Sequence, residues 1–249
     1  MVSKEERDLL KERINIPGRK TYQEVFDNST LMVLYDLMSS GQLDILAYPI
    51  STGKEAKVFK GVRKDGTEVA VKIMRINTAV FRKYREYIEG DHRFKNIGSG
   101  RNLIFSWTKK EFSNLKKMHS KGVRVPEPYA VTKNVLVMEY LKDDDHPAPM
   151  LKDLKLDDES CQILFEDIVE DMKKLHNEVK LIHGDLSEYN ILLSQEYPYF
   201  IDVSQSVPLN HPKANELINR DIRNMVRYFS EHGVSITKEE LLNKIIEEE

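Results

Sequence analysis

The hydrophobic pattern changes character along the chain, and this change constrains the fold more than any other feature of the sequence. Between residues 45 and 74, short apolar runs alternate with polar or smaller residues, as in β-strands, and Lys64-Asp65-Gly66 supplies a turn between two of them. From Cys161 to Leu175, and again from about 214 to 229, the pattern is helical, with an apolar stripe in the first segment. We therefore expect an α+β protein.

This asymmetry predicts two unequal lobes. The polar run Asp143 to Asp145, followed by prolines at 147 and 149, indicates a linker between them. The expected organisation is a helical N-terminal extension over residues 1–44, a β-rich lobe over 45–141 with a mobile loop at about 75–105, and a reduced helical lobe over 142–249.

Composition restricts the class of partner and the compartment. The 38 basic and 41 acidic residues give a net charge of −3, so the overall charge does not indicate a nucleic-acid or membrane partner. The single cysteine, Cys161, excludes an internal disulfide and lies in the apolar stripe, which predicts a buried thiol. With a charged N-terminus and no apolar run near the ~18 residues that span a bilayer, we expect a soluble cytoplasmic protein.

Three polar residues near residue 190 carry the strongest chemical signal. Asp185 and Asn190 lie on a predicted loop flanked by short apolar strands, and Asp202 follows the next strand pair. Phosphoryl transfer needs a carboxylate that deprotonates the acceptor hydroxyl and oxygen ligands for magnesium ions. The spacing matches the H-x-D-x-x-x-x-N catalytic loop, which predicts Asp185 as the base and Asn190 and Asp202 as ligands of Mg²⁺ or Mn²⁺.

Alternative interpretations exist for this loop. Asp and Asn populate turns for local hydrogen-bonding reasons, and either residue alone would be assigned to a turn. The flanking strands, the order of the residues and an upstream lysine together favour the catalytic interpretation. His183 is expected to brace the loop and not to act as a base.

A lysine and a glutamate upstream are predicted to form an ion pair that positions phosphates. Lys72 ends a V-A-V-K pattern on an alternating strand, where it is expected to bind the α and β phosphates of a nucleotide. A lone strand lysine is more often a solvated edge residue. Glu111 is the candidate partner, although Thr108-x-x-Glu111 is also a capping box in which Glu111 would satisfy the start of a helix.

The segment before the lysine is the predicted nucleotide loop. Its hydroxyl and N–H groups can cradle phosphates, and its residues are Ser51, Thr52, Gly53, Lys54, Glu55 and Ala56. The P-loop pattern G-x-x-x-x-G-K-[ST] is absent, and a strand follows in place of a helix.

The adenine ring is expected to contact a second set of residues. Val58 should cover the ring, main-chain groups of Glu139 and Leu141 should bind its edge, and Ile201 completes the set. The alternative for the segment around Glu139 is packing of an edge strand.

With these residues in place, the sequence resembles the RIO family of atypical serine protein kinases, in particular its first subfamily. The resemblance runs from about Asp27 to Gly233 and rests on STGKEA at 51–56, HGDLSEYN at 183–190 and IDVSQ at 201–205. It implies a small two-lobed protein-kinase-like fold, ATP as substrate and the residue roles assigned above. It also implies a role in maturation of the small ribosomal subunit and ATP hydrolysis with Asp202 as phosphate acceptor.

The sequence also departs from ordinary protein kinases. Val203-Ser204 replaces the Phe-Gly that follows the metal aspartate, Ser187 stands where many protein kinases carry a lysine, and no Ala-Pro-Glu follows. Since 47 residues follow Asp202, we expect no long activation segment. We also expect no N-terminal winged-helix domain of the kind found in the second RIO subfamily.

Three functions remain open at this point. The first is an ATP- and magnesium-dependent serine/threonine kinase with ATPase activity, acting on proteins or RNA of the small-subunit precursor and on itself at Ser99 or Ser113. The second is a small-molecule phosphotransferase of the aminoglycoside or choline kinase type, which shares H-G-D-x-x-x-x-N. The third is an ATP-gated, non-catalytic assembly factor that binds RNA through basic residues, namely Arg82, Lys83, Arg85, Arg93, Lys95, Arg101, Lys109 and Lys110.

Overall fold

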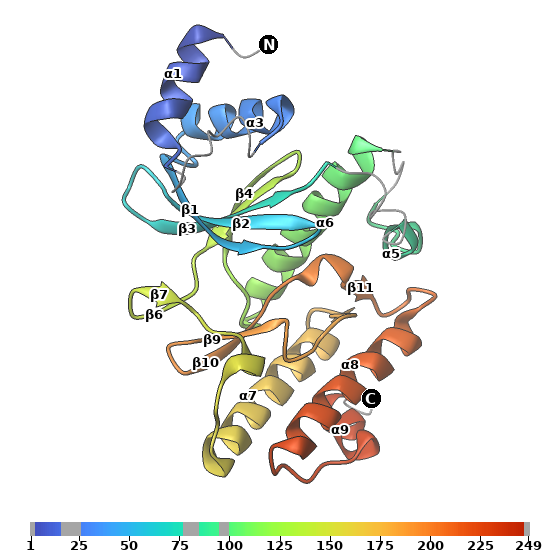
Figure 1. Ribbon diagram of the computed structural model, residues 1–249. Coiled ribbons are helices and arrows are strands. Elements are labelled where there is room, and N and C mark those ends of the chain that lie inside the picture. Colours follow the sequence, from blue (N-terminus) through green and yellow to red (C-terminus); the bar gives the residue numbers. More distant parts are fainter. Residues whose placement is uncertain (1–2, 16–25, 77–84, 95–99, 247–249) are drawn as a thin grey trace. The chain divides into compact units, whose positions relative to one another are not determined.

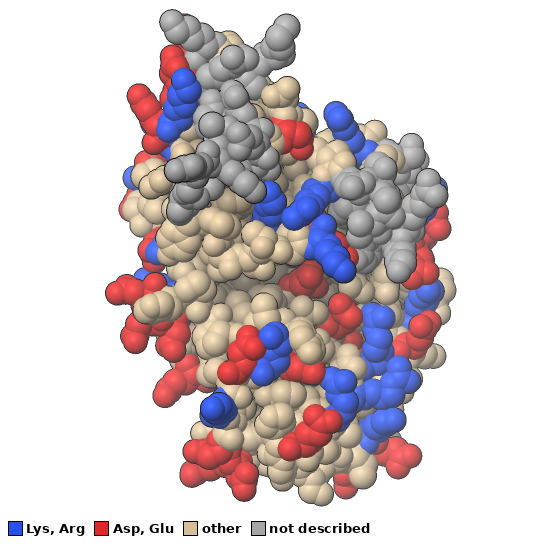
Figure 2. All heavy atoms as spheres, viewed as in Figure 1, with Lys and Arg blue, Asp and Glu red and all other residues tan. Residues whose placement is uncertain are grey.

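The computed structural model describes residues 3–15, 26–76, 85–94 and 100–246 (Figure 1). The chain divides into two compact units: residues 1–83, 96–112 and 127–140 form the first, and residues 84–95, 113–126 and 141–249 form the second. Acidic and basic side chains are interspersed on the face shown in Figure 2. None of the helices in the described ranges is long and apolar enough to cross a membrane.

The first unit is built on one antiparallel sheet of order β1-β2-β3-β5-β4. Its strands are β1 (Ile45–Thr52), β2 (Ala56–Val62), β3 (Glu68–Met74), β4 (Pro128–Thr132) and β5 (Val135–Glu139). Asp65 stabilises the turn before β3 by accepting a hydrogen bond from the Thr67 N–H. β3 is the central strand of this sheet.

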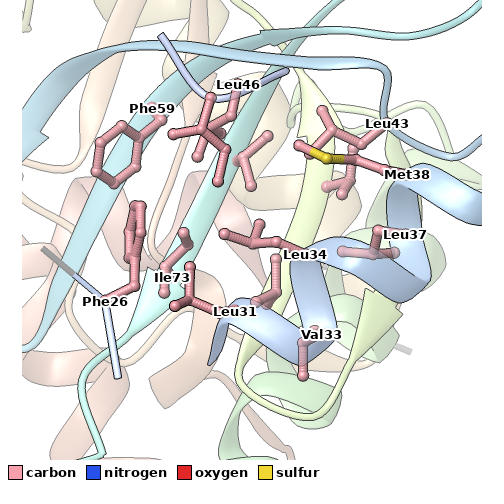
Figure 3. Close-up of a cluster of buried hydrophobic side chains, with 14 of the residues drawn as sticks. Phe26, Leu31, Val33, Leu34, Leu37, Met38, Leu43, Leu46, Phe59 and Ile73 are labelled. Carbon is pink, nitrogen blue, oxygen red and sulfur yellow. The ribbon is translucent and has the colours of Figure 1, made fainter. Parts of the chain in front are cut away.

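Two helices cover one face of this sheet, α1 (Lys4–Arg13) and α3 (Asn28–Ser39). Helix α3 is capped by Asp27, whose carboxylate accepts from the Thr30 N–H. Apolar residues of α3 share a cluster of buried side chains with Phe59 of β2, whose ring lies 5.3 Å from that of Phe26, just before the helix (Figure 3). This cluster is the hydrophobic core of the first unit.

The alternation of β3 assigns its side chains to opposite faces of the sheet. Val69, Val71 and Ile73 belong to the core cluster beneath α3. Because successive side chains of a strand point to opposite faces, Lys72 points away from that cluster. One face of the strand thus packs into the core, and the other face carries the buried cation Lys72.

Helix α6 (Arg101–His119) contributes its first part to the first unit and its last part to the second. We expected a loop at 75–105 and a helix from Thr108. In the described part of that segment, residues 85–89 instead form α5, and α6 begins seven residues earlier, at Arg101. The buried side chains of Leu103, Ile104 and Trp107 supply the apolar face that extends the helix.

The second unit is mainly helical, with α7 (Asp158–Asn177), α8 (Ala214–Glu231) and α9 (Lys238–Ile245) packed together (Figure 1). Cys161 is buried on α7, as predicted. Short strands pair in three ribbons, which are β9 (Ile191–Ser194) with β10 (Tyr197–Phe200), β8 (Leu181–Ile182) with β11 (Val207–Pro208), and β6 (Lys142–Asp143) with β7 (His146–Pro147). The last ribbon occupies part of the predicted linker, and α9 was not predicted.

Candidate active site

Lys72 and Glu111 form a buried ion pair within the first unit. The Lys72 Nζ lies 2.6 Å from the Glu111 Oε1, and the two side chains are 10% and 2% exposed. Burying both charges is tolerated because each supplies the other's counter-charge. The lysine is therefore held in a fixed position on β3, as phosphate positioning requires.

The capping-box alternative for Glu111 is excluded by the position of the helix start. Thr108 lies inside α6, where its Oγ1 donates to the Ile104 carbonyl. Glu111 is thus an interior residue of the helix and does not satisfy its first N–H groups.

The predicted nucleotide loop is the exposed turn of the β1–β2 hairpin. The Gly53 N–H donates to the Ala56 carbonyl at 2.9 Å, and the Glu55 carbonyl accepts from Arg75 N. Ser51, Thr52 and Lys54 lie at or next to the turn and are exposed, whereas Val58 is half-buried on β2. The turn presents hydroxyls, an ammonium group and backbone amides together, which are the groups that bind phosphates.

The segment predicted to bind the adenine edge has part of its main chain already engaged. The Glu139 N–H donates to the Glu127 carbonyl, and the Leu141 carbonyl accepts from Ala148. An adenine at this segment would therefore have to use the Glu139 carbonyl and the Leu141 N–H. Ile201 is half-buried, and its carbonyl contacts the His183 ring.

In the second unit, the loop that carries Asp185 is fixed by helix α8. The buried Asp221 carboxylate accepts hydrogen bonds from the Gly184 N–H at 2.8 Å and the Leu186 N–H at 2.9 Å. Gly184 has φ +81°, and a Cβ there would lie 3.1 Å from the Gln205 carbonyl oxygen. Only glycine adopts this backbone readily at so close an approach.

Burial raises the pKa of Asp221 to about 7, although the two backbone N–H bonds and the Arg220 charge oppose that rise. The Asp221 carboxylate thus has two amide donors in place of water, and these donors belong to the residues on either side of Asp185. This arrangement fixes the backbone of the predicted catalytic base.

Three donors surround the Asp185 carboxylate. The Gln205 Nε2 lies 3.0 Å and the Asn190 Nδ2 3.5 Å from Oδ2, and the Arg220 Nη2 lies 3.8 Å from Oδ1. Burial raises the pKa of Asp185, the Arg220 charge lowers it, and the nearby Asp202 charge raises it further. The loop therefore holds a carboxylate that is partly exposed and oriented by neighbours.

Asp202 adopts a left-handed backbone, with φ 58° and ψ 49°. For a residue other than glycine this conformation is uncommon and persists only where the surrounding structure imposes it. Here the Asn114 Nδ2 donates to the Val203 carbonyl at 2.8 Å and fixes the turn that follows. The Ser204 Oγ lies 3.1 Å from the Asp202 Oδ1 and orients the carboxylate.

Asn190 and Asp202 form a donor set that fits magnesium. The Asn190 Nδ2 donates to the Asp185 carbonyl at 2.8 Å, which leaves the amide oxygen as the ligand atom. Carboxylate and amide oxygens are hard ligands, and Mg²⁺ in phosphotransferases uses one or two carboxylates together with substrate phosphates. The described residues contain no cluster of three or more His, Cys, Asp or Glu side chains that would favour a different metal.

His183 braces the loop. It is buried, its Nε2 lies 3.1 Å from the Ile201 carbonyl, and its Nδ1 accepts from the Asp185 N–H at 3.3 Å. Burial lowers the pKa of His183 to about 4, so the ring is neutral at pH 7. This agrees with a structural role and not with that of a base.

Sequence reasoning missed the roles of Gln205, Arg220 and Asp221. Their contacts join segments far apart in the sequence, so no local motif reports them. Asp221 did leave a signal, because it lies four residues from both Leu217 and Met225 on the buried face of α8. A charged residue on an apolar face indicates a buried polar role.

The structure and the site define a protein of the protein-kinase class, with a β-rich unit that holds a lysine–glutamate pair and a helical unit that holds an Asp-Asn-Asp set. Residues 57–242 match the RIO domain. The chain belongs to the RIO family of serine/threonine-protein kinases.

Relatives and solved structures agree with this assignment. The RIO-type serine/threonine-protein kinase Rio1 of Haloferax volcanii is 44% identical over 86% of this chain and 73% of the relative. Rio1 of Methanocaldococcus jannaschii is 41% identical over 95% and 81%. The serine/threonine-protein kinase RIO1 of Caenorhabditis elegans is 36% identical over 92% of this chain but 46% of its own length. The Rio2 kinase of Chaetomium thermophilum has a TM-score of 0.67 at 26% identity, covering 87% and 67%.

The buried ion pair makes a testable prediction about stability. Replacing Lys72 with Met leaves the Glu111 carboxylate buried without its counter-charge and should lower the free energy of unfolding by about 3–5 kcal/mol. The double variant K72M/E111Q removes both charges and should be more stable than K72M. Denaturant unfolding without nucleotide measures both effects.

The matched control is Lys11→Met, because Lys11 pairs with Asp8 at the surface, where the side chains are 65% and 59% exposed. This change should cost less than about 1 kcal/mol. Equal losses for K72M and K11M would show that the buried pair does not hold Lys72.

Proposed function

We propose that this protein transfers the γ-phosphoryl group of ATP to serine or threonine hydroxyls. The observation that carries the proposal is the Asp185 carboxylate beside Asn190, on a loop whose backbone is fixed by Asp221. The names of the archaeal relatives state this activity for those proteins. Membership of the RIO family favours it over the aminoglycoside or choline kinase alternative.

In the proposed reaction Asp185 accepts the proton of the acceptor hydroxyl. The hydroxyl oxygen bonds to the γ-phosphorus while the bond from that phosphorus to the ADP oxygen breaks, and ADP leaves. Lys72, held by Glu111, binds the α and β phosphates, and the turn at Gly53 cradles the phosphate chain through backbone N–H groups. Magnesium bound by Asn190 and Asp202 would neutralise the charge of the phosphate oxygens.

The proposal predicts the effect of removing the base. Asp185→Asn keeps the size of the side chain but cannot accept the proton, and it should lower serine phosphorylation by roughly 10²–10⁴-fold. Transfer of radiolabel from ATP to the protein itself and to a generic acceptor protein measures this. Asp143→Asn, an exposed change in the same unit, should retain full activity. Undiminished transfer by D185N would refute the assigned base.

We propose a second activity, ATP hydrolysis through a phosphorylated Asp202. A solved structure of the Chaetomium thermophilum Rio2 kinase contains ADP, Mg²⁺ and phosphoaspartate, and it shares the fold with a TM-score of 0.65. In this chain Asp202 is held in a left-handed conformation and oriented by Ser204. An Asp202 oxygen would attack the γ-phosphorus and release ADP, and water would then cleave the acyl phosphate to free phosphate.

The acyl phosphate has its own chemical signature. Label on wild-type protein should divide into a hydroxylamine-labile fraction and a stable fraction. Asp202→Asn should abolish the labile fraction, and with it the ATP turnover that occurs without a protein acceptor. An ATPase rate in D202N equal to that of the wild type would contradict the proposal.

We propose that the partner is a component of the small ribosomal subunit precursor, as the family resemblance implies. The described part of the basic segment gives limited support for an RNA contact: Arg85 pairs with Glu89, Arg93 pairs with Asp91, and Lys110 is buried. Arg101 and Lys109 are exposed, while Arg82, Lys83, Lys95 and the candidate phosphorylation site Ser99 lie outside the described residues. Ser113, the other candidate, is exposed within α6.

Cosedimentation with isolated small-subunit precursors tests the partner. Binding should require these particles in preference to mature subunits. If RNA phosphates contribute, binding should weaken as salt rises, and R101Q/K109Q should bind less tightly and depend less on salt. Equal binding to precursor and mature particles would contradict the proposed partner.

A further inference from the structure

Gln205, Arg220 and Asp185 form a closed arrangement of three side chains. The Gln205 amide donates to the Asp185 Oδ2 at 3.0 Å, and its Oε1 lies 3.4 Å from the Arg220 Nη2. The same guanidinium nitrogen lies 3.8 Å from the Asp185 Oδ1. Each carboxylate oxygen of Asp185 thus has a different donor beside it, and the two donors are themselves joined.

Arg220 of helix α8 makes a second contact with the catalytic loop, through the backbone of the loop. The Arg220 Nη2 also donates to the Gly184 carbonyl, next to the N–H that Asp221 binds. The Asn224 Nδ2 donates to the Leu186 carbonyl at 2.9 Å. Because consecutive residues of one rigid helix contact the backbone on both sides of Asp185, the distance between the guanidinium and the carboxylate is fixed by the fold.

Arg220 keeps its charge in this environment. Burial lowers its pKa, but a hydrogen bond to the Tyr87 oxygen and electrostatic interactions with Tyr87, Asp185 and Asp221 more than compensate and raise it overall. The side chain is 32% exposed, so the cation is only partly shielded from water.

The catalytic loop itself brings no cation to this place. Residues 183–190 contain neither lysine nor arginine, and Ser187 occupies the position of the lysine that many protein kinases carry. A carboxylate on a partly exposed loop can rotate, and each unproductive orientation lowers the fraction of molecules ready to react. In this protein the orienting charge comes from Arg220 of α8, which lies more than thirty residues further along the chain than Asp185.

We propose that Arg220, with Gln205, is a positioning residue that holds the Asp185 carboxylate in the orientation needed to accept the hydroxyl proton. Gln205 fixes the Asp185 Oδ2 by a hydrogen bond. The Arg220 charge attracts the Asp185 Oδ1 from 3.8 Å, which leaves this oxygen able to accept the proton of the substrate hydroxyl. The inference rests on the proposed kinase activity and deepens it. It concerns the chemical step and not the binding of ATP, whose predicted ligands are other residues.

The test is Arg220→Gln, which removes the charge but keeps an amide that can donate to the Gly184 carbonyl. Steady-state kinetics should show kcat for serine phosphorylation lowered by about 10- to 100-fold, with KM for ATP changed by less than about twofold. Arg220→Lys restores the charge without the planar fork and should recover part of the loss. Arg223→Gln is the matched control, because it makes the same change on an exposed residue of the same helix, over which basic side chains gather in Figure 2. It should leave kcat unchanged.

A double-variant cycle separates positioning from a general effect on the fold. In the Asp185→Asn background, R220Q should leave the residual single-turnover rate unchanged, because there is no carboxylate left to orient. Gln205→Leu gives an independent probe that does not alter α8, and it should lower kcat in the same way. Melting temperatures and nucleotide affinity show whether each variant is folded.

The outcomes are distinguishable. If D185N itself retains full transfer, the proposed base is wrong and the inference falls with it. If D185N is inactive but R220Q and Q205L behave like R223Q, the kinase assignment stands and the positioning role is refuted. A further loss when R220Q is added to D185N would also refute it, since Arg220 would then act without Asp185.

Discussion

The catalytic loop depends on one buried carboxylate. Asp221 accepts the N–H groups of Gly184 and Leu186, the residues on either side of Asp185. Burial favours the neutral form of this carboxyl group, and the two amide donors favour the ionised form. The two hydrogen bonds replace water around the Asp221 carboxylate and fix the backbone at Asp185. The loop is thereby attached to helix α8 of the second unit.

In the first unit, strand β3 fixes the position of the charged side chain of Lys72. On β3, Val69, Val71 and Ile73 enter the core beneath α3, and the alternation of the strand directs Lys72 to the other face, where Glu111 lies. Core packing thus places Lys72 on the sheet, and the Glu111 carboxylate fixes its ammonium group. In each unit a charged functional group, Lys72 or Asp185, is fixed by residues whose own role is structural. The exposed parts that would meet substrate are the turn at Gly53 and the carboxylate of Asp185.

The parts of the site that were predictable lie in recognisable sequence motifs. Asp185 and Asn190 were assigned from their spacing, and the Lys72–Glu111 pair from motif order, which the structure confirms as an ion pair. Arg220 was not predictable because its helix carries no motif, so nothing in the sequence links it to Gly184, Asp185 or Gln205, which it contacts in the fold. The early start of α6 was missed because Gly98-Ser99-Gly100 favours a loop, whereas the helix that starts right after it buries Leu103, Ile104 and Trp107.

A single-turnover experiment with γ-labelled ATP tests the central claim most directly. Wild-type protein, mixed with less than one equivalent of ATP and magnesium, is quenched over time, and phosphoserine or phosphothreonine, phosphoaspartate and free phosphate are separated. The account predicts that phosphorylated hydroxyl residues form on the protein or an added acceptor protein and keep their label after hydroxylamine treatment. Label found only in phosphoaspartate and free phosphate, with no phosphoserine or phosphothreonine at any time, would contradict the assignment of kinase activity to Asp185.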